Sequence, residues 1–118
     1  MLNDVQLQRL RQIAGSDNLL TDSGSLENYG QDRTRYFNPA PSAVIFARNI
    51  SQLTEIVRSA NDERLALVPS GGRTGLSGGA VACNGEIVIS FDRMNRILSF
   101  NAIDQTVTLE AGVITRTL

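Results

Sequence analysis

Residues 69–80 read Pro-Ser-Gly-Gly-Arg-Thr-Gly-Leu-Ser-Gly-Gly-Ala, and the rest of the chain is arranged around this stretch. Five of the chain's ten glycines lie within it. Glycine has no Cβ and adopts positive φ without strain, so this backbone is free to curl and to approach a ligand closely. A curl that points successive N–H groups at one place forms a nest, which binds anions such as phosphate. The stretch therefore predicts a diphosphate-binding loop.

Four side chains of the same stretch add hydrogen-bond donors for an anion. They are the hydroxyls of Ser70, Thr74 and Ser77 and the guanidinium of Arg73. A Walker A loop is excluded, because that motif needs a lysine and the chain contains none.

A Rossmann loop also fits the stretch poorly. That fingerprint needs glycines at positions i, i+2 and i+5 and a helix directly behind them. Here Gly72, Gly75 and Gly78 are spaced three apart, and a turn and a β-branched run follow instead of a helix. The sequence thus predicts that loop amides, without a helix dipole, hold the ligand.

The composition narrows the class of protein. The chain has 118 residues with 42% hydrophobic content, the size of one domain or of part of one. A net charge of -1 argues against a nucleic-acid or membrane-surface partner. No apolar run approaches the roughly 18 residues of a membrane span, and the N-terminus does not resemble a signal peptide. We therefore expect a soluble cytoplasmic protein.

The lack of histidine and the single cysteine limit the catalytic and metal-binding chemistry of the chain. The chain contains no histidine, so it offers no histidine base and no histidine metal ligand. Its single cysteine, Cys83, forms neither an internal disulfide nor a zinc cluster, which agrees with a reducing compartment. A space-filling residue beside a turn is the ordinary interpretation of Cys83, and a reactive thiol is the alternative. The sequence predicts no metal site and assigns no catalytic residue.

A strand, a helix and a second strand precede the glycine stretch. Residues 43–47 form an apolar run of strand length, typical of a strand buried on both faces. Ser51 is the predicted N-cap of the helix, and residues 65–68 form the second strand. The predicted inner face of the helix is Leu53, Ile56, Val57 and Ala60. Such a βαβ unit has parallel strands and a right-handed crossover, so the glycine stretch leaves the carboxyl end of a strand.

Residues 1–38 form a predicted irregular helical lead-in to this unit. Periodicity predicts a helix over 4–14 that Gly15 ends, a brief extended piece at 19–21 and a helical turn at 26–29.

The segment 29–37 concentrates three of the chain's six aromatic residues and has two interpretations. In the first, the aromatic rings pack against the core while Asp32 pairs with a neighbouring arginine. In the second, the segment lies near the ligand.

Three strand-like segments follow the glycine stretch, at 87–91, 97–101 and 106–111. They predict an antiparallel meander, which makes the fold class α+β. Alternation in the last strand predicts one buried face, composed of Val107, Leu109 and Ala111. Residues 113–118 begin a further segment without a cap or a breaker, so we expect the chain to be part of a longer protein.

Five segments, in this order and spacing, resemble the FAD-binding region shared by the vanillyl-alcohol oxidase type flavoproteins, the PCMH-type fold. They are Pro41–Val44, the helix from Ser51, residues 69–80, Asp92–Asn95 and Thr106–Val113. The resemblance extends over about residues 29–118. Within this family, the glycine stretch looks most like the FAD-linked D-2-hydroxy acid dehydrogenases, the group of the glycolate oxidase subunit and D-2-hydroxyglutarate dehydrogenase.

The resemblance implies that FAD lies between two subdomains, and that residues 39–118 form the first and end before the second. It also implies contacts between FAD and two parts of the chain, the glycine stretch and the end of the last strand. The implied FAD-binding residues are Pro69, Ser70, Gly71, Gly72, Arg73, Thr74, Gly75, Leu76, Ser77, Gly78, Gly79, Gly112 and Val113. Some relatives attach the flavin to a histidine in this region, so the lack of histidine implies non-covalent FAD.

The implied whole protein is an FAD-linked oxidase or dehydrogenase that converts a D-2-hydroxy acid into the 2-oxo acid and passes electrons to an acceptor. Its catalytic residues are expected beyond Leu118, and the chain alone is expected to be inactive. Two alternatives remain: a binding module for another phosphorylated ligand, and a structural or interaction domain. Apolar surface exposed by truncation is expected to let the chain self-associate.

Overall fold

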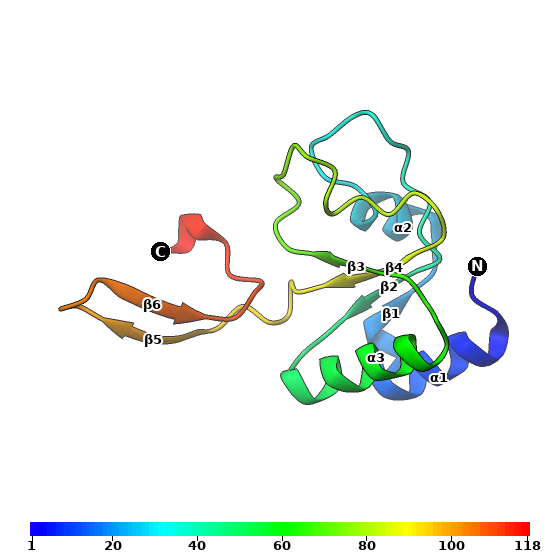
Figure 1. Ribbon diagram of the computed structural model, residues 1–118, viewed down its shortest axis with the longest axis horizontal. Helices are drawn as coiled ribbons and strands as arrows, with labels where there is room; N and C mark the ends of the chain where they lie inside the picture. The colour runs from blue at the N-terminus through cyan, green and yellow to red at the C-terminus, as the bar shows by residue number, and fades with distance from the viewer.

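A computed structural model describes residues 1–118 and contains a four-stranded sheet, a separate two-stranded hairpin and three α-helices (Figure 1). The helices are α1 (Asp4–Ala14), α2 (Ser23–Tyr29) and α3 (Ile50–Asp62), with short 3-10 turns at Ser16–Asn18 and Thr115–Thr117. The strands are β1 (Leu19–Leu20), β2 (Ala43–Phe46), β3 (Leu67–Ser70), β4 (Ile87–Ser90), β5 (Ile97–Asn101) and β6 (Thr106–Leu109).

Three parallel strands form the centre of the larger sheet. The strand order is β1-β2-β4-β3, in which β2, β4 and β3 are parallel and β1 is antiparallel to β2. Every residue of β2 and β4 is buried, because both faces of the sheet are covered. Ile45 and Ile89 belong to a core shared with α1 and α3, whereas Val44 and Val88 belong to a second core with α2. Figure 1 shows these helices on opposite sides of the sheet.

The α+β class and the parallel βαβ unit are confirmed, but the place of residues 87–91 was predicted wrongly. These residues do not begin an antiparallel meander. Strand β4 lies between β2 and β3, and Ile87 pairs in parallel register with both Ala43 and Leu67. The connection from β3 to β4 contains no helix, so the chain pattern lacked the usual sign of a second parallel crossover. Only β5 and β6 form an antiparallel pair after the glycine stretch.

Helix α3 begins earlier than predicted, and its inner face is confirmed at Leu53, Ile56 and Ala60 but not at Val57. Its N-cap is Asn49, whose side chain accepts a hydrogen bond of 2.8 Å from the Gln52 amide, so the predicted cap Ser51 is wrong. The predicted inner residue Val57 is 45% exposed. Helix α3 lies against α1 as well as against the sheet, and Ser59 is buried in place of Val57.

The first part of the chain contributes to the main core. Helix α1 is confirmed, with a capping box between Asn3 and Gln6. The extended piece at Leu19–Leu20 pairs with β2, so it is a strand of the sheet. Because Leu10 and Leu19 belong to the same core cluster as Ile45, residues before and after position 39 are packed together.

The hairpin of β5 and β6 projects away from the larger sheet and is amphipathic (Figure 1). Its register places Ile97 opposite Leu109 and Phe100 opposite Val107, so apolar side chains share one face. Serine, asparagine and threonine residues occupy the other pairs. The predicted burial of the β6 face is wrong for this chain, because Val107 is 38% exposed and Ala111 is exposed, although Leu109 is half-buried.

The base of the hairpin is closed by Arg96 and Glu110. The Glu110 carboxylate accepts hydrogen bonds from the Arg96 side chain, at 2.7 and 3.1 Å, and from the Arg96 amide at 2.8 Å. The Glu110 amide returns a hydrogen bond of 2.9 Å to the Arg96 carbonyl. The side-chain bond from Arg96, followed by its backbone bond, lowers the pKa of Glu110 below the ordinary value of 4.5.

We therefore expect the Glu110 ion pair to stabilise the fold above pH 4.5 and to lose this effect as the pH falls through the lowered pKa. The reason is that the unfolded carboxyl takes up a proton before the folded one does. Urea unfolding from pH 7 to pH 3 should show wild type more stable than Glu110→Gln at neutral pH, with the difference shrinking below pH 4.5. A difference that stays constant over this range would contradict the prediction.

Candidate functional site

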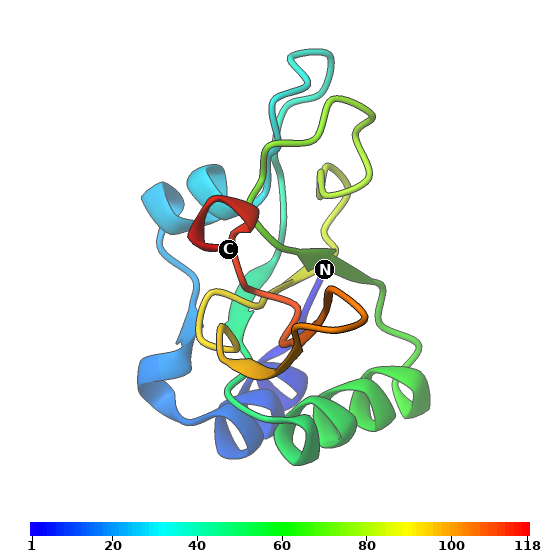
Figure 2. The ribbon, with the colours of Figure 1, turned by 90° about the vertical axis from the view of Figure 1, so that its left-hand side faces the viewer.

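The glycine loop, defined here as residues 71–80, begins at the carboxyl end of β3. Ser70 is the last residue of β3 and pairs with Ser90, the last residue of β4, so two parallel strands end side by side next to the loop. Figure 2 shows the loop on the side of the sheet opposite to α1 and α3, next to the segment that follows α2. The carboxyl end of a parallel sheet, where the loop begins, is the place at which α/β proteins bind ligands.

The amides of the glycine loop are largely unpaired. From Gly71 to Ser77, no main-chain N–H donates a hydrogen bond to another part of the chain. The next amide, that of Gly78, donates to the Asp32 carboxylate at 3.1 Å. Exposed amides bind water when no ligand is present, so this run of donors at the surface is open to an external anion. The hydroxyl-bearing Thr74 and Ser77 are exposed in the same run.

The curl of the loop depends on fewer glycines than the sequence predicts. Among its glycines only Gly78 has a positive φ, at 77°. Arg73 also adopts a positive φ, 56°, which is uncommon for a residue with a side chain. Gly71, Gly72, Gly75 and Gly79 do not have positive φ values, so their backbone conformation does not require glycine.

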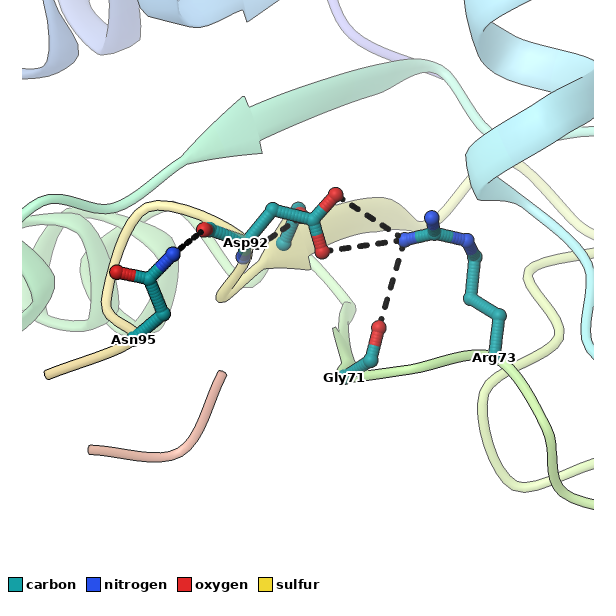
Figure 3. Close-up of polar contacts among 5 residues, drawn as sticks. Gly71, Arg73, Asp92 and Asn95 are labelled. Atoms are coloured by element: carbon teal, nitrogen blue, oxygen red, sulfur yellow. Dashed lines mark hydrogen bonds and ion pairs between the residues drawn. The ribbon is translucent and has the colours of Figure 1, made fainter. Parts of the chain in front are cut away.

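The Arg73 side chain is held within the protein (Figure 3). Its Nη1 atom lies 3.3 and 3.5 Å from the two carboxylate oxygens of Asp92 and 3.4 Å from the Gly71 carbonyl. The guanidinium also lies over the Tyr29 ring, 4.5 Å from its centre. Asp92 thus balances the charge of Arg73, and the guanidinium connects the loop with the turn after β4.

Ser70 carries the one buried side-chain polar atom that lacks a hydrogen-bond partner. Its residue is fully buried at the start of the loop. A buried hydroxyl without a partner is costly, and native structures keep few such groups. The unpaired amides and the exposed hydroxyls of Thr74 and Ser77 together form a donor set that fits the oxygens of a diphosphate, whereas the Ser70 hydroxyl lies beneath the surface.

The segment after β6 lies beside the first half of the glycine loop. A Cβ atom built on Gly71 would lie 3.9 Å from the Ala111 carbonyl, and one built on Gly72 would lie 3.3 Å from the Ile114 side chain. The structure thus brings the two predicted parts of the site together. Val113, next to Ile114, is half-buried.

Gly112 itself has a packing reason to be glycine. Its amide donates a hydrogen bond of 2.8 Å to the Met94 carbonyl, and a Cβ built on it would lie 1.8 Å from the Phe91 carbonyl oxygen. No real Cβ fits at that distance. Gly112 therefore allows the chain after β6 to pass against the turn after β4.

Sequence reasoning did not identify the partners of the segment 29–37. Asp32 does not pair with an arginine, because its carboxylate accepts from the amides of Thr34, at 2.7 Å, and Gly78. Of the aromatic residues, Tyr29 packs edge-on against Phe46 at 5.0 Å, whereas Tyr36 and Phe37 are exposed. The bond from the Thr34 amide to Asp32 could have been predicted, because aspartate side chains often accept from the amide two residues later. The bond from the Gly78 amide to Asp32 could not, because the two residues are far apart in sequence.

No helix of the structure combines the length and the apolarity that crossing a membrane requires.

A family model described as "FAD binding domain" matches residues 41–118. Over 118 residues the chain is 50% identical to D-2-hydroxyglutarate dehydrogenase of Stutzerimonas stutzeri, covering 100% of this chain and 25% of that protein. It is 46% identical to D-2-hydroxyglutarate dehydrogenase of Xanthomonas citri pv. viticola, covering 95% and 24%, and 32% identical to glycolate oxidase subunit GlcD of Bacillus subtilis, covering 92% and 23%. The chain spans about a quarter of the length of these curated relatives.

Solved structures share the fold. An alkyldihydroxyacetonephosphate synthase aligns with a TM-score of 0.85 at 15% identity, covering 98% of this chain and 24% of that chain. A p-cresol methylhydroxylase aligns with a TM-score of 0.80 at 24% identity, covering 93% and 22%. At these identities the likeness concerns the fold alone.

We predict that Gly112→Ala lowers the free energy of unfolding by about 2 kcal/mol or more, because the new methyl group overlaps the Phe91 carbonyl. Chemical unfolding of the two proteins measures the difference. Gly24→Ala is the matched control: a Cβ at Gly24 meets only an Asp22 oxygen at 3.7 Å, and alanine in a helix should leave the stability unchanged or raise it by up to about 1 kcal/mol. Equal stability of the Gly112 variant and wild type would contradict the packing argument.

Proposed function

The chain belongs to the FAD binding domain family, and on this premise we propose that its glycine loop holds the diphosphate of FAD. The observation that carries this proposal is the run of amides from Gly71 to Ser77 that have no acceptor within the chain. Diphosphate oxygens are acceptors only, so they match a site made of donors. The exposed hydroxyls of Thr74 and Ser77 would add donors at the same place, and the buried Ser70 would lie at the base of the loop.

The remaining residues of the proposed site support this donor set. Pro69 lies in β3 directly before Ser70, and Leu76, Gly78 and Gly79 form the second half of the loop. Arg73 would act through the shape of the loop, because its guanidinium is already bound to Asp92. Gly112 and Val113 would border the site next to Gly71.

We propose that the FAD is bound without a covalent link to this chain. The chain contains no histidine, and its one cysteine, Cys83, is an exposed residue beside Asn84–Gly85, before the start of β4. Cys83 lies at the amino end of β4, whereas the unpaired amides from Gly71 onward start at the carboxyl end of β3. Non-covalent binding therefore depends on the donors described above.

We propose that the whole protein is an FAD-dependent dehydrogenase that oxidises a D-2-hydroxy acid, with D-2-hydroxyglutarate as the first candidate. The support is the 50% identity to a D-2-hydroxyglutarate dehydrogenase, which extends over the entire chain. When bound, FAD accepts the two electrons that leave the substrate as its alcohol carbon becomes a ketone carbon. The chain's own contribution is to bind and orient that cofactor. Substrate contacts, catalytic residues and the electron acceptor's site belong to the remaining three quarters of the protein.

In this proposal residues 39–118 form the first part of the FAD-binding domain and residues 1–38 lead into it. The apolar face of the β5–β6 hairpin is then a surface for the rest of the domain, because a two-stranded hairpin alone is marginally stable. In the isolated chain the same face would promote self-association. Membership of the family disfavours the two alternatives, a module for another phosphorylated ligand and a purely structural domain.

We predict that Gly75→Val in the full-length protein weakens FAD binding by about tenfold or more, because a branched side chain obstructs close approach of the diphosphate to the loop amides. FAD content on purification and titration of the apoprotein measure the change. Gly24→Val is a matched control: a Cβ at either glycine would lie 3.7 Å from an aspartate oxygen, yet Gly24 lies in α2. Wild-type FAD content in the Gly75 variant would contradict the proposed site.

We predict that D-2-hydroxyglutarate bleaches the visible flavin absorbance of the full-length protein under anaerobic conditions. The L-enantiomer should leave the absorbance unchanged, and D-lactate and glycolate should act more slowly. Faster reduction by D-lactate or glycolate would change the substrate but not the class of enzyme. A colourless protein that carries a different nucleotide would overturn the flavin proposal itself.

A further inference from the structure

A segment far from the glycine loop in sequence is hydrogen-bonded to its second half. We call residues 30–37 the strap. The Arg33 amide donates to the Gly75 carbonyl at 3.0 Å, and the Asp32 carboxylate accepts from the Gly78 amide at 3.1 Å. The strap hydroxyl of Thr34 lies 3.4 Å from the Leu76 carbonyl. Figures 1 and 2 both show the two segments side by side.

Asp32 is the residue of the strap that contacts two different parts of the backbone. One carboxylate oxygen accepts from the Thr34 amide at 2.7 Å, and the other accepts from Gly78. Gly78 is also the loop glycine with a positive φ, and the Phe37 ring lies 3.3 Å from where its Cβ would be. Asp32 thus holds the loop at the residue where its backbone turns.

A carboxylate beside a predicted diphosphate site needs an explanation, because two anions repel each other. Both oxygens of Asp32 are already bound to amides, and Asp32 is half-buried. Charge-assisted hydrogen bonds of this type stabilise the carboxylate where it is. Asp32 occupies the Gly78 amide, whereas the amides from Gly71 to Ser77 have no partner in the chain and stay open to an outside anion.

We propose that Asp32 is a positioning residue that shapes the glycine loop for FAD before the cofactor binds. This inference rests on the proposed function of the loop. Without Asp32, the backbone at Gly78 would lose its bond to the strap and would be less ordered before FAD binds. Ordering it on binding would reduce the affinity. The competing possibility is that Asp32 opposes the cofactor through its charge, and the two make opposite predictions.

The test compares FAD binding by the full-length apoproteins of wild type, Asp32→Ala and Asp32→Asn. We expect Asp32→Ala to raise the Kd for FAD by about tenfold, as the loss of a charge-assisted hydrogen bond implies. Asp32→Asn retains one acceptor oxygen, so its Kd for FAD should lie between those of wild type and Asp32→Ala. If the alanine variant does not fold, the Kd of Asp32→Asn alone tests the positioning role. Hydrogen exchange of the Gly78 amide in the apoprotein should be faster in both variants, because this amide loses its bond to a charged carboxylate.

Glu86→Ala is the matched control. The Glu86 carboxylate accepts a hydrogen bond of 2.7 Å from the amide of Asn84, two residues away. Glu86 directly precedes β4, so it lies at the end of that strand opposite to the start of the loop. It should change neither the Kd nor exchange in the loop. An unchanged or lower Kd in both Asp32 variants would overturn the positioning role while leaving the proposed function intact. Absence of FAD binding by wild type would instead refute the proposed function.

Discussion

The insertion of β4 between β2 and β3 is the constraint on which the rest of the structure depends. Because all three strands are parallel, the chain that leaves the carboxyl end of β3 must return past the sheet to the amino end of β4. Residues 71–86 make this connection without a helix. Their backbone groups therefore lack the regular partners that a helix supplies, which is why the amides from Gly71 to Ser77 remain available.

Contacts from three directions hold the connection in place. Arg73 ties its first half to Asp92 after β4, Asp32 ties its second half to the strap, and the segment at Gly112 passes beside its beginning. The Arg73 and Asp92 side chains are partly exposed, 24% and 35%, so their pair contributes modestly to stability, on the order of 1 kcal/mol. Its importance lies in the conformation of Arg73, whose positive φ such contacts maintain.

Local sequence patterns predicted correctly the features that depend on residues close together in sequence. The end of α1 at Gly15, the apolar run of β2 and the turn after the glycine loop were predictable, because each depends on residues within a few positions. The cap of α3 was misplaced by two residues, since Asn49 and Ser51 are both suitable and only packing chooses between them. The face of α3 shifted for the same reason, because contact with α1 buries Ser59 and leaves Val57 exposed.

The sequence by itself determined that a glycine-rich loop follows a parallel strand, that no histidine takes part, and that the family is one that binds FAD. Each of these follows from residue identity and order. Only the tertiary structure decided that β4 is the central strand, that Asp32 binds Gly78, and that Gly112 passes against Phe91. Those facts depend on contacts between residues that lie far apart in the chain. A hydrophobic pattern predicts which side chains are buried, but it does not specify which distant residues they contact.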